Sequence, residues 1–431
     1  MLHDNYTVGE NGHLFVGGCD TVSLARKYGT PLYVIDEDKV RRSMRKFREI
    51  MQKYFPAGSR VLYASKALSY VDIYRVAASE GLGADVVSSG EIYTALKGGL
   101  PGSAMYFHGN NKTDEDIEYA LGAGVGTFVA DCREELEYLD AAARRIGKKQ
   151  DVLLRITPGI DPHTHKKVVT GSVDSKFGTP IETGQAYELV RFALGLKNIT
   201  LRGFHSHIGS QIFDSGPFSD AAEIMMRFIA DLPGKLGYTA EYLNLGGGYG
   251  VTYTEDRADL DADRVLREIS EKLTGLAGEF GIEVPKIIIE PGRALVAAAG
   301  GTLYTVGSVK NIPGYRTYVS IDGGMPDNPR YALYQSDYTA LIASKAAEPA
   351  SQRVTIAGRC CESGDLIQEN APLQSCRRGD ILAVLVTGAY NYSMASNYNR
   401  IPRPAMVSVS GGKDRLVVRR ESFEDLVRNE L

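Results

Sequence analysis

Eight short runs rich in β-branched residues alternate with segments of helical pattern between about residues 60 and 290. This alternation is typical of a parallel sheet whose strands are joined by helices. Eight repeats over about 230 residues match a closed (β/α)8 barrel better than an open doubly wound sheet. We therefore predict a TIM-like barrel with strands at 61–64, 83–87, 104–107, 127–130, 152–156, 201–205, 242–245 and 286–289.

The pattern changes after residue 293, where short strands are separated by turn residues with little helix between them. A chain of 431 residues also exceeds the usual size of a single domain. We predict a barrel domain at 36–296 and a mostly β domain formed by 1–35 together with 297–431. The strands expected in the β domain are 14–16, 32–34, 303–310, 316–321, 352–357, 380–385 and 405–410.

Charge and apolar content limit the classes of partner. A net charge of −4 gives no reason to expect nucleic acid or an anionic membrane as a partner. No apolar stretch approaches the roughly 20 residues that span a bilayer, and the first residues lack a signal-peptide pattern. Five scattered cysteines without a C-x-x-C pair indicate reduced thiols. These features predict a cytoplasmic protein, and leave the adjacent Cys360 and Cys361 as a possible site of thiol chemistry.

Reactive side chains follow several of the expected barrel strands, where enzymes of this fold carry their active sites. Lys66 comes just after the strand 61–64, so it is either a Schiff-base former or a surface cation. The other expected strands also end in ionisable residues or glycine-rich segments, namely Asp85, His108, Asp131, Arg155, His205 to Ser210, Asn244 to Gly250 and Glu290 to Arg293.

Two groups among these residues suit one cofactor. The glycines at 246–248, with Arg293 and Ser210, could surround a phosphate, although a triple glycine alone also fits a tight turn. Lys66 could form an imine with an aldehyde, while Glu290 could keep a pyridine nitrogen protonated. Pyridoxal phosphate needs all of these groups. Glu290 could instead be a structural partner of Arg293.

The motifs in their order resemble a known family, the fold-type III pyridoxal-phosphate decarboxylases of basic amino acids, which have an alanine racemase-like fold. The resemblance spans nearly the whole chain. It rests on Tyr63-Ala64-Ser65-Lys66-Ala67, His207-Ile208-Gly209-Ser210, Gly246-Gly247-Gly248, Glu290-Pro291-Gly292-Arg293, Cys361-Glu362-Ser363-Gly364-Asp365 and Gly388-Ala389-Tyr390. Within the family, the diaminopimelate decarboxylase group is most similar at Ser175-Lys176-Phe177-Gly178, Asp322-Gly323-Gly324-Met325, Asp327-Asn328-Pro329-Arg330 and Ser393-Met394-Ala395-Ser396-Asn397-Tyr398-Asn399.

The resemblance implies a decarboxylation of meso-2,6-diaminopimelate to L-lysine and CO2, the last step of lysine biosynthesis. It implies that Lys66 forms the Schiff base, that His207 stacks on the cofactor ring, and that Glu290 pairs with the ring nitrogen. Asp85 would support the lysine and the ring. The phosphate would lie among Ser210, Gly246, Gly247, Gly248, Arg293 and Tyr390, and the substrate among Arg293, Arg330, Tyr334, Glu362 and Tyr390.

The resemblance further implies a homodimer with shared active sites, because in the family Cys361 and Glu362 come from the second subunit. Cys361 would be the acid that reprotonates the product. Cys360 is interpreted as a small buried hydrophobic residue. The family often has Asn two residues after the lysine, where this chain has Leu68.

Other interpretations stay open. A decarboxylase of ornithine, arginine or lysine fits most of the same motifs. A regulator that binds the cofactor without catalysis fits some of them. A racemase would leave the Cys-Glu-Ser-Gly-Asp run unexplained. The long segment 157–180 is a candidate lid, centred on 161–176. We expect no metal site, since no further Cys or His completes a zinc-type set with His163 and His165.

Overall fold

The computed structural model describes residues 3–160, 174–255 and 258–431. The chain divides into two compact units. One, called the β unit, comprises Met1–Ser43, Val251–Ala258 and Arg293–Leu431; the other, called the barrel unit, comprises Met44–Gly250 and Asp259–Gly292.

The barrel unit contains a closed parallel barrel, as predicted. Its strands are hydrogen-bonded in the order β9, β11, β12, β13, β5, β6, β7, β8, and the pairing of β8 with β9 closes the ring. All eight predicted strands are confirmed to within two residues at each end. They are β5 (Arg60–Ala64), β6 (Gly83–Val86), β7 (Met105–Phe107), β8 (Thr127–Ala130), β9 (Gln150–Thr157), β11 (Ile199–His205), β12 (Tyr242–Asn244) and β13 (Lys286–Ile289). The short β10 (Thr179–Pro180), not predicted, pairs with the end of β9.

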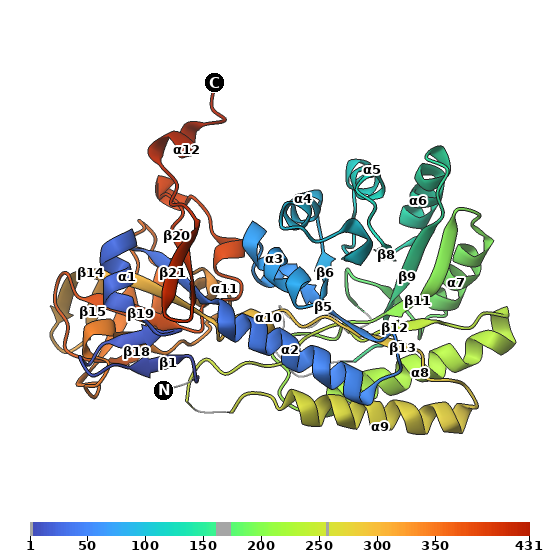
Figure 1. The fold of residues 1–431 in the computed structure, drawn as a ribbon, viewed down its shortest axis with the longest axis horizontal. Coiled ribbons are helices and arrows are strands. Elements are labelled where there is room, and N and C mark those ends of the chain that lie inside the picture. Colours follow the sequence, from blue (N-terminus) through green and yellow to red (C-terminus); the bar gives the residue numbers. More distant parts are fainter. Residues whose placement is uncertain (1–2, 161–173, 256–257) are drawn as a thin grey trace. The chain divides into compact units, whose positions relative to one another are not determined.

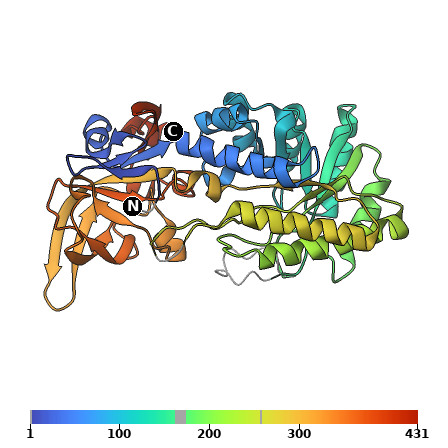
Figure 2. The ribbon, with the colours of Figure 1, turned by 60° about the horizontal axis from the view of Figure 1, so that its bottom comes forward.

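Helices lie outside the strands (Figure 1). Their starts follow local chemistry: at α5, for example, Thr113 and Asp116 form a reciprocal capping box. The long α8 and α9 lie side by side in Figures 1 and 2. The helices of this part of the chain are α2 (Glu37–Tyr54), α3 (Val71–Ser79), α4 (Ser89–Lys97), α5 (Asp114–Gly122), α6 (Arg133–Arg145), α7 (Gln185–Gly195), α8 (Gly216–Leu236) and α9 (Ala262–Phe280), with the 3-10 turns η1 (Ser65–Ala67) and η2 (Gly102–Ala104).

The inside of the barrel is packed with apolar side chains. Leu62, Tyr106, Val129, Leu153 and Ile288 form one buried cluster, each from a different strand. Full burial of an aliphatic or aromatic side chain contributes about 1.5–3 kcal/mol. The barrel is therefore a rigid scaffold whose strand ends present side chains at fixed positions.

The β unit is built on a sheet in the order β18, β17, β15, β14, β4, β20, β21, with β19 joined to β14 and β16. The N-terminal strand β4 lies between β14 and β20, so the predicted completion of this sheet by the N-terminal segment is confirmed. The long β14–β15 hairpin is seen in orange in Figure 2. The strands are β4 (Leu32–Asp36), β14 (Gly300–Ile312), β15 (Arg316–Ile321), β16 (Ala340–Ile342), β17 (Gln352–Ala357), β18 (Leu366–Leu373), β19 (Ile381–Leu385), β20 (Ala405–Ser410) and β21 (Lys413–Val418).

A smaller antiparallel sheet and short helices complete this unit. The seven strands predicted for the β domain are all present, whereas β1, β3, β16, β18 and β21 were not predicted. The remaining elements are β1 (Tyr6–Val8), β2 (Leu14–Val16), β3 (Cys19–Asp20), α1 (Thr21–Tyr28), α10 (Arg293–Val296), α11 (Arg330–Tyr334), α12 (Phe423–Val427), η4 (Ala343–Lys345), η5 (Tyr392–Met394) and η6 (Tyr398–Arg400).

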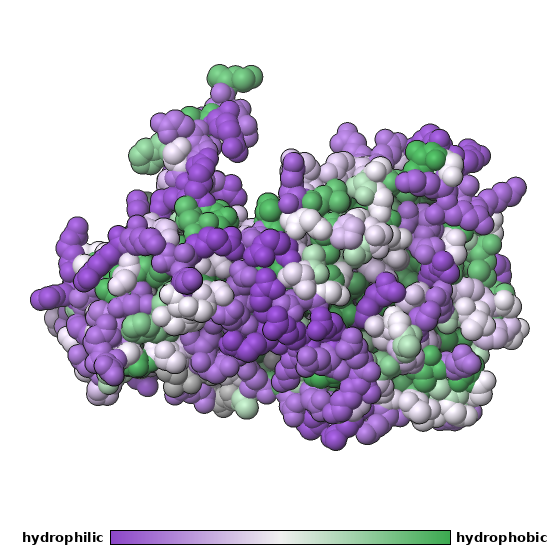
Figure 3. All heavy atoms as spheres, in the orientation of Figure 1, coloured by the Kyte–Doolittle hydropathy of each residue, from purple (hydrophilic) through white to green (hydrophobic). Residues whose placement is uncertain are grey.

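Apolar and charged side chains separate between core and surface. Hydrophilic side chains cover most of the face drawn in Figure 3, and hydrophobic ones appear between them in small groups. Among the described residues, no helix is both long and apolar enough to cross a membrane.

Candidate active site

A cavity of about 380 Å³ lies at the carboxyl ends of the barrel strands. Its size is within the range of small-molecule sites, about 300–1,000 Å³. It brings together four residues that the sequence had singled out separately: Lys66, Asp85, His207 and Glu290. The full lining is Lys66, Asp85, Val87, His108, Gly109, Asn110, Asn111, Arg155, Phe177, His205, His207 and Glu290.

Lys66 lies in the 3-10 turn that directly follows β5. Its neighbour Ser65 ties this turn to the next strand, because Ser65 Oγ lies 2.8 Å from the backbone oxygen of Asp85. Lys66 Nζ is 4.0 Å from Asp85 Oδ2, and the lysine side chain is 45% exposed. Burial raises the pKa of Asp85, an effect that His108 and Lys66 offset only in part. The lysine amine is thus accessible and has a carboxylate beside it.

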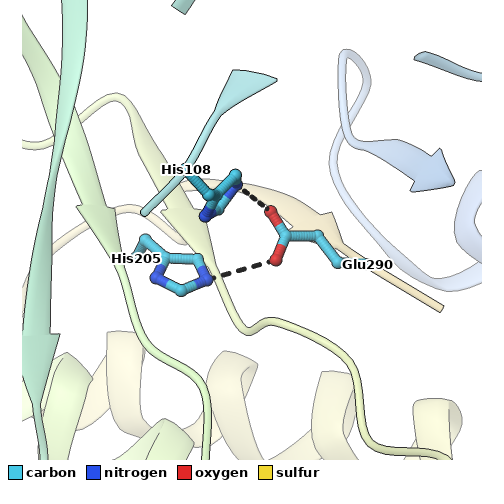
Figure 4. A group of neighbouring side chains, drawn as sticks. All are labelled: His108, His205 and Glu290. Atoms are coloured by element: carbon cyan, nitrogen blue, oxygen red, sulfur yellow. Dashed lines mark hydrogen bonds and ion pairs between the residues drawn. The ribbon is translucent and has the colours of Figure 1, made fainter. Parts of the chain in front are cut away.

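Glu290 follows β13 and is the centre of a buried polar cluster (Figure 4). Its Oε1 lies 2.8 Å from His108 Nε2, and its Oε2 lies 3.2 Å from His205 Nε2. Asn244 Nδ2 donates a hydrogen bond of 2.6 Å to Oε1. Burial by itself raises the pKa of Glu290, but electrostatic interaction and hydrogen bonding with His108 and His205 outweigh it and hold the pKa well below the ordinary value. Glu290 is therefore an ionised carboxylate.

His207 is fixed against the glycine loop. Its Nδ1 accepts a hydrogen bond of 3.2 Å from the backbone N–H of Gly247. Burial, aided by the positive charge of Lys66, holds the pKa of His207 well below its ordinary value. The ring is therefore neutral and its plane is fixed by the loop, as a stacking partner requires.

The loop at 246–248 needs glycine for two reasons. Gly246 and Gly248 have positive φ values of 69° and 114°. A Cβ on Gly247 would lie 2.2 Å from the backbone oxygen of Glu290, and one on Gly248 would lie 2.4 Å from that of Gly209. The backbone of Ile212 pairs with Gly248 and Gly250, so the segment that carries Ser210 runs beside this loop.

The β unit holds a second predicted group, in which two buried arginines lie among tyrosine rings. Arg293 Nη1 donates a 2.6 Å hydrogen bond to the hydroxyl of Tyr253, and its guanidinium is 4.7 Å from the ring centre of Tyr390. The guanidinium of Arg330 is 5.2 Å from the ring centre of Tyr334 and 5.5 Å from that of Tyr390. Buried guanidinium groups beside aromatic rings suit carboxylate or phosphate oxygens.

Cys361 and Glu362 lie in the loop between β17 and β18, where both are exposed in the single chain. The backbone N–H of Cys361 donates to Asn399 Oδ1 at 2.7 Å. The interpretation of Cys360 as a buried residue is wrong, because it is half-exposed beside Asp365. Burial, together with the charge of Asp365, raises the pKa of Cys360 to about 12, so this thiol stays protonated.

The structure adds residues to which the sequence had assigned no role. His108, Arg155, His205 and Asn244 were noted only as polar ends of strands, yet all four face the cavity or Glu290. Arg155 stacks on Phe177, with its guanidinium 4.4 Å from the ring centre. Leu68, the position of the missing Asn, is buried and its backbone oxygen accepts a hydrogen bond from the hydroxyl of Tyr63. The predicted lid at 161–176 lies largely outside the described residues, as do His163 and His165.

Comparison with known proteins agrees with this geometry. Residues 37–297 match the family model described as the pyridoxal binding domain of pyridoxal-dependent decarboxylases. A diaminopimelate decarboxylase from Bacillus subtilis is 46% identical over 100% of this chain and 98% of its own length. The chain belongs to the diaminopimelate decarboxylase family. A family member from Staphylococcus aureus is 42% identical over 98% of both chains.

Solved structures of the diaminopimelate decarboxylase family share the whole fold. The enzyme from M. jannaschii has a TM-score of 0.91 at 34% identity and covers 99% of this chain and 98% of its own. The enzyme from Helicobacter pylori, complexed with L-lysine, has a TM-score of 0.86 at 30% identity and covers 95% of this chain and 99% of its own. A lysine/ornithine decarboxylase from Vibrio vulnificus, at 22% identity and a TM-score of 0.75, shares the fold.

Proposed function

We propose that this chain, as a carboxy-lyase, converts meso-2,6-diaminopimelate to L-lysine and CO2 with pyridoxal phosphate as its cofactor. The observation that carries the proposal is the cavity in which Lys66, Asp85, His207 and Glu290 meet, in a chain 46% identical to a diaminopimelate decarboxylase over its full length. This reaction would be the last step of lysine biosynthesis.

The residues present fit the cofactor. Lys66 offers an amine for the aldehyde, Glu290 an ionised carboxylate for a protonated ring nitrogen, and His207 a neutral ring of fixed orientation. Asp85 Oδ1 is buried and has no hydrogen-bond partner within the described part of the chain, which is expected where a ligand supplies one. Ser210, the 246–248 loop, Arg293 and Tyr390 would hold the phosphate.

Bound pyridoxal phosphate supplies an electron sink for the electron pair left when the substrate carboxylate departs as CO2. The chain's own groups bind, orient and move protons. Lys66 Nζ would hold the cofactor, Glu290 would orient it through the ring nitrogen, and Asp85 would stabilise the lysine. The Cys361 thiol would deliver a proton from Sγ to the substrate carbon that has lost its carboxylate.

Substrate selection would lie in the arginine and tyrosine group. Arg330, Tyr334, Arg293 and Tyr390 would bind carboxylate oxygens, and Glu362 would bind the distal ammonium group. Ornithine, arginine and lysine lack the second carboxylate, so an arginine that binds this carboxylate would favour diaminopimelate over them.

Homodimers would share active sites, with Cys361 and Glu362 supplied by the second subunit. The barrel at 36–296 would bind the cofactor, and 1–35 with 297–431 would form the dimer interface. Cytoplasmic location stays a prediction.

The test is CO2 release from meso-diaminopimelate, L-lysine, L-ornithine and L-arginine, with and without added pyridoxal phosphate. We expect release from diaminopimelate alone, and its loss in Lys66→Ala. Lys97→Ala, at the exposed end of α4, is the matched control and should keep full activity. Preferred turnover of another diamino acid would replace the proposed substrate, and release unaffected by Lys66→Ala would refute the role of the lysine.

A further inference from the structure

Three side chains from other strands surround the carboxylate of Glu290. His205 ends β11 and Asn244 ends β12, the two strands that precede β13 in the ring, whereas His108 follows β7, three strands from β13 on its other side. The N···O distances are 2.8 Å from His108, 3.2 Å from His205 and 2.6 Å from Asn244. All four side chains are buried, so these contacts are shielded from bulk water.

The direction of the hydrogen bonds from His205 and Asn244 can be assigned. Burial lowers the pKa of His205 to about 3, so its ring is neutral and carries one proton. Its Nδ1 is buried without a hydrogen-bond partner among the described residues, whereas Nε2 faces Glu290 Oε2. The proton therefore lies on Nε2 and is donated to Glu290. Asn244 also donates, because its Oδ1 already accepts from the N–H of Gly246 at 2.9 Å.

We propose that His108 and His205, with Asn244, are positioning residues that hold Glu290 as an ionised hydrogen-bond acceptor for the ring nitrogen of the cofactor. An ionised carboxylate that already receives N–H groups from His205 and Asn244 can only accept, so its remaining partner must carry a proton. The two histidines would thus set the protonation of the cofactor ring through Glu290. This inference rests on the proposed function, which requires pyridoxal phosphate in the same cavity.

A metal site is the main rival interpretation. One ligand atom each from His108, His205 and Glu290 lies within 4.8 Å of the others, and two histidines with one carboxylate can bind a divalent metal. Two cations, Lys66 and Arg155, line the same cavity and would repel such an ion. The amide N–H of Asn244 is also directed at the oxygen that would be a ligand. The contacts therefore favour a hydrogen-bonded carboxylate.

The test compares a variant that keeps an N–H donor with one that removes it. His205→Gln retains the donor, whereas His205→Leu does not, and each is made in the native chain and in Glu290→Gln. His13→Leu, which removes the imidazole that pairs with Asp20 in the β unit, controls for the loss of a histidine elsewhere. Two quantities are measured: the dissociation constant of pyridoxal phosphate from the apoprotein, and the pH at which the visible absorbance of the loaded protein changes.

We expect His205→Leu to weaken cofactor binding by about tenfold, the effect of one buried charged hydrogen bond. The absorbance change should move to lower pH, because Glu290 loses a donor that stabilises its negative charge and so stabilises the proton on the ring nitrogen less. His205→Gln and His13→Leu should stay close to the native protein. In the Glu290→Gln background, His205→Leu should change neither quantity, since the histidine acts through Glu290.

Equal effects of His205→Leu with and without Glu290 would overturn the inference, as would one-to-one Zn²⁺ binding by the apoprotein that is lost in His205→Gln. If His205→Leu does not fold, His108→Leu tests the same coupling. Turnover of a different diamino acid would remove the proposed substrate and leave this inference standing. A native chain that does not bind pyridoxal phosphate would refute both.

Discussion

Arg330 is a buried cation with few hydrogen-bond partners among the described residues. It is buried beside three tyrosine rings, and its Nη2 contacts only Ser336 Oγ, at 3.3 Å, among the hydrogen bonds of the described residues. A charge removed from water is costly unless it has a partner. A substrate carboxylate would supply that partner.

Replacing Arg330 tests this assignment. Arg330→Gln should raise KM for diaminopimelate by about 10- to 100-fold, equivalent to a charged hydrogen bond of about 1.5–3 kcal/mol. Steady-state kinetics of CO2 release measures it. Arg353→Gln, at an exposed arginine of β17, should change nothing. An unchanged KM in Arg330→Gln would exclude the arginine from substrate binding.

His205 gives a pH dependence of stability whose sign can be stated. Burial depresses its pKa from 6.5 to about 3, so the neutral ring stabilises the fold fully above about pH 6.5. That contribution is lost as the pH falls from about 6.5 toward 3, by up to about 1.4 kcal/mol per pH unit. We expect His205→Gln to flatten this part of the curve in urea unfolding of the apoprotein between pH 4 and 7. An identical slope in the variant would contradict the assignment of a buried neutral ring.

The candidate site was predictable from the sequence only in part. Lys66, Asp85 and Glu290 stand at strand ends, where chain position alone indicates a role. The partners of Glu290 could not be inferred in this way, because His108, which follows β7, and His205, at the end of β11, meet only when the barrel closes. His108 and His205 are nearly 100 residues apart in the sequence, so their shared contact with the Glu290 carboxylate is not evident from it.

At the scale of elements, interior strands were predictable and edge strands were not. Barrel strands are buried on both faces, so they appear in the sequence as continuous apolar runs. The strands β18 and β21 lie at the two ends of their sheet and each pairs with a single neighbour in it. β18 contains Asn370 at a positive φ of 51° and a shift in its register. Polar residues and irregular backbone are tolerated in an edge strand, so its sequence lacks the apolar run or alternation that predicts a strand.

The glycine loop at 246–248 is an element whose backbone lies too close to its neighbours for a larger residue. Gly247→Ala would place Cβ 2.2 Å from the backbone oxygen of Glu290, so the loop or β13 must move. We expect this variant to fold but to bind pyridoxal phosphate at least about tenfold more weakly, measured by absorbance titration of the apoprotein. Gly275→Ala is the matched control, because it lies within α9 with no atom within 4 Å of the added Cβ. Gly275→Ala should bind the cofactor normally and gain up to about 1 kcal/mol in helix stability. Equal cofactor binding by the two variants would show that the close approach at Gly247 has no functional role.

At the scale of the whole molecule, the proposed site residues divide between the two units. The barrel unit carries Lys66, His207 and Glu290, and the β unit carries Arg293, Arg330 and Cys361. Each unit has its own buried core, which holds that unit's residues in place. Cys361 and Glu362 are exposed in the single chain, as residues would be that complete the site of a second copy.

Shared sites predict complementation between two inactive variants. Lys66→Ala and Cys361→Ala should each lose most activity alone, for different reasons. If Cys361 acts in the partner's site, a mixed dimer contains one site with both residues intact. Random reassociation makes half of the dimers mixed, so the mixture should recover roughly a quarter of native CO2 release. The control mixes the double variant Lys66→Ala/Cys361→Ala with the native chain. Its mixed dimers would contain no site with both residues intact, so native homodimers alone should give roughly a quarter of native CO2 release, against roughly a half if Cys361 acts in its own chain. No recovery in the first mixture, despite mixed dimers detected by native mass spectrometry, would place Cys361 in the site of its own chain.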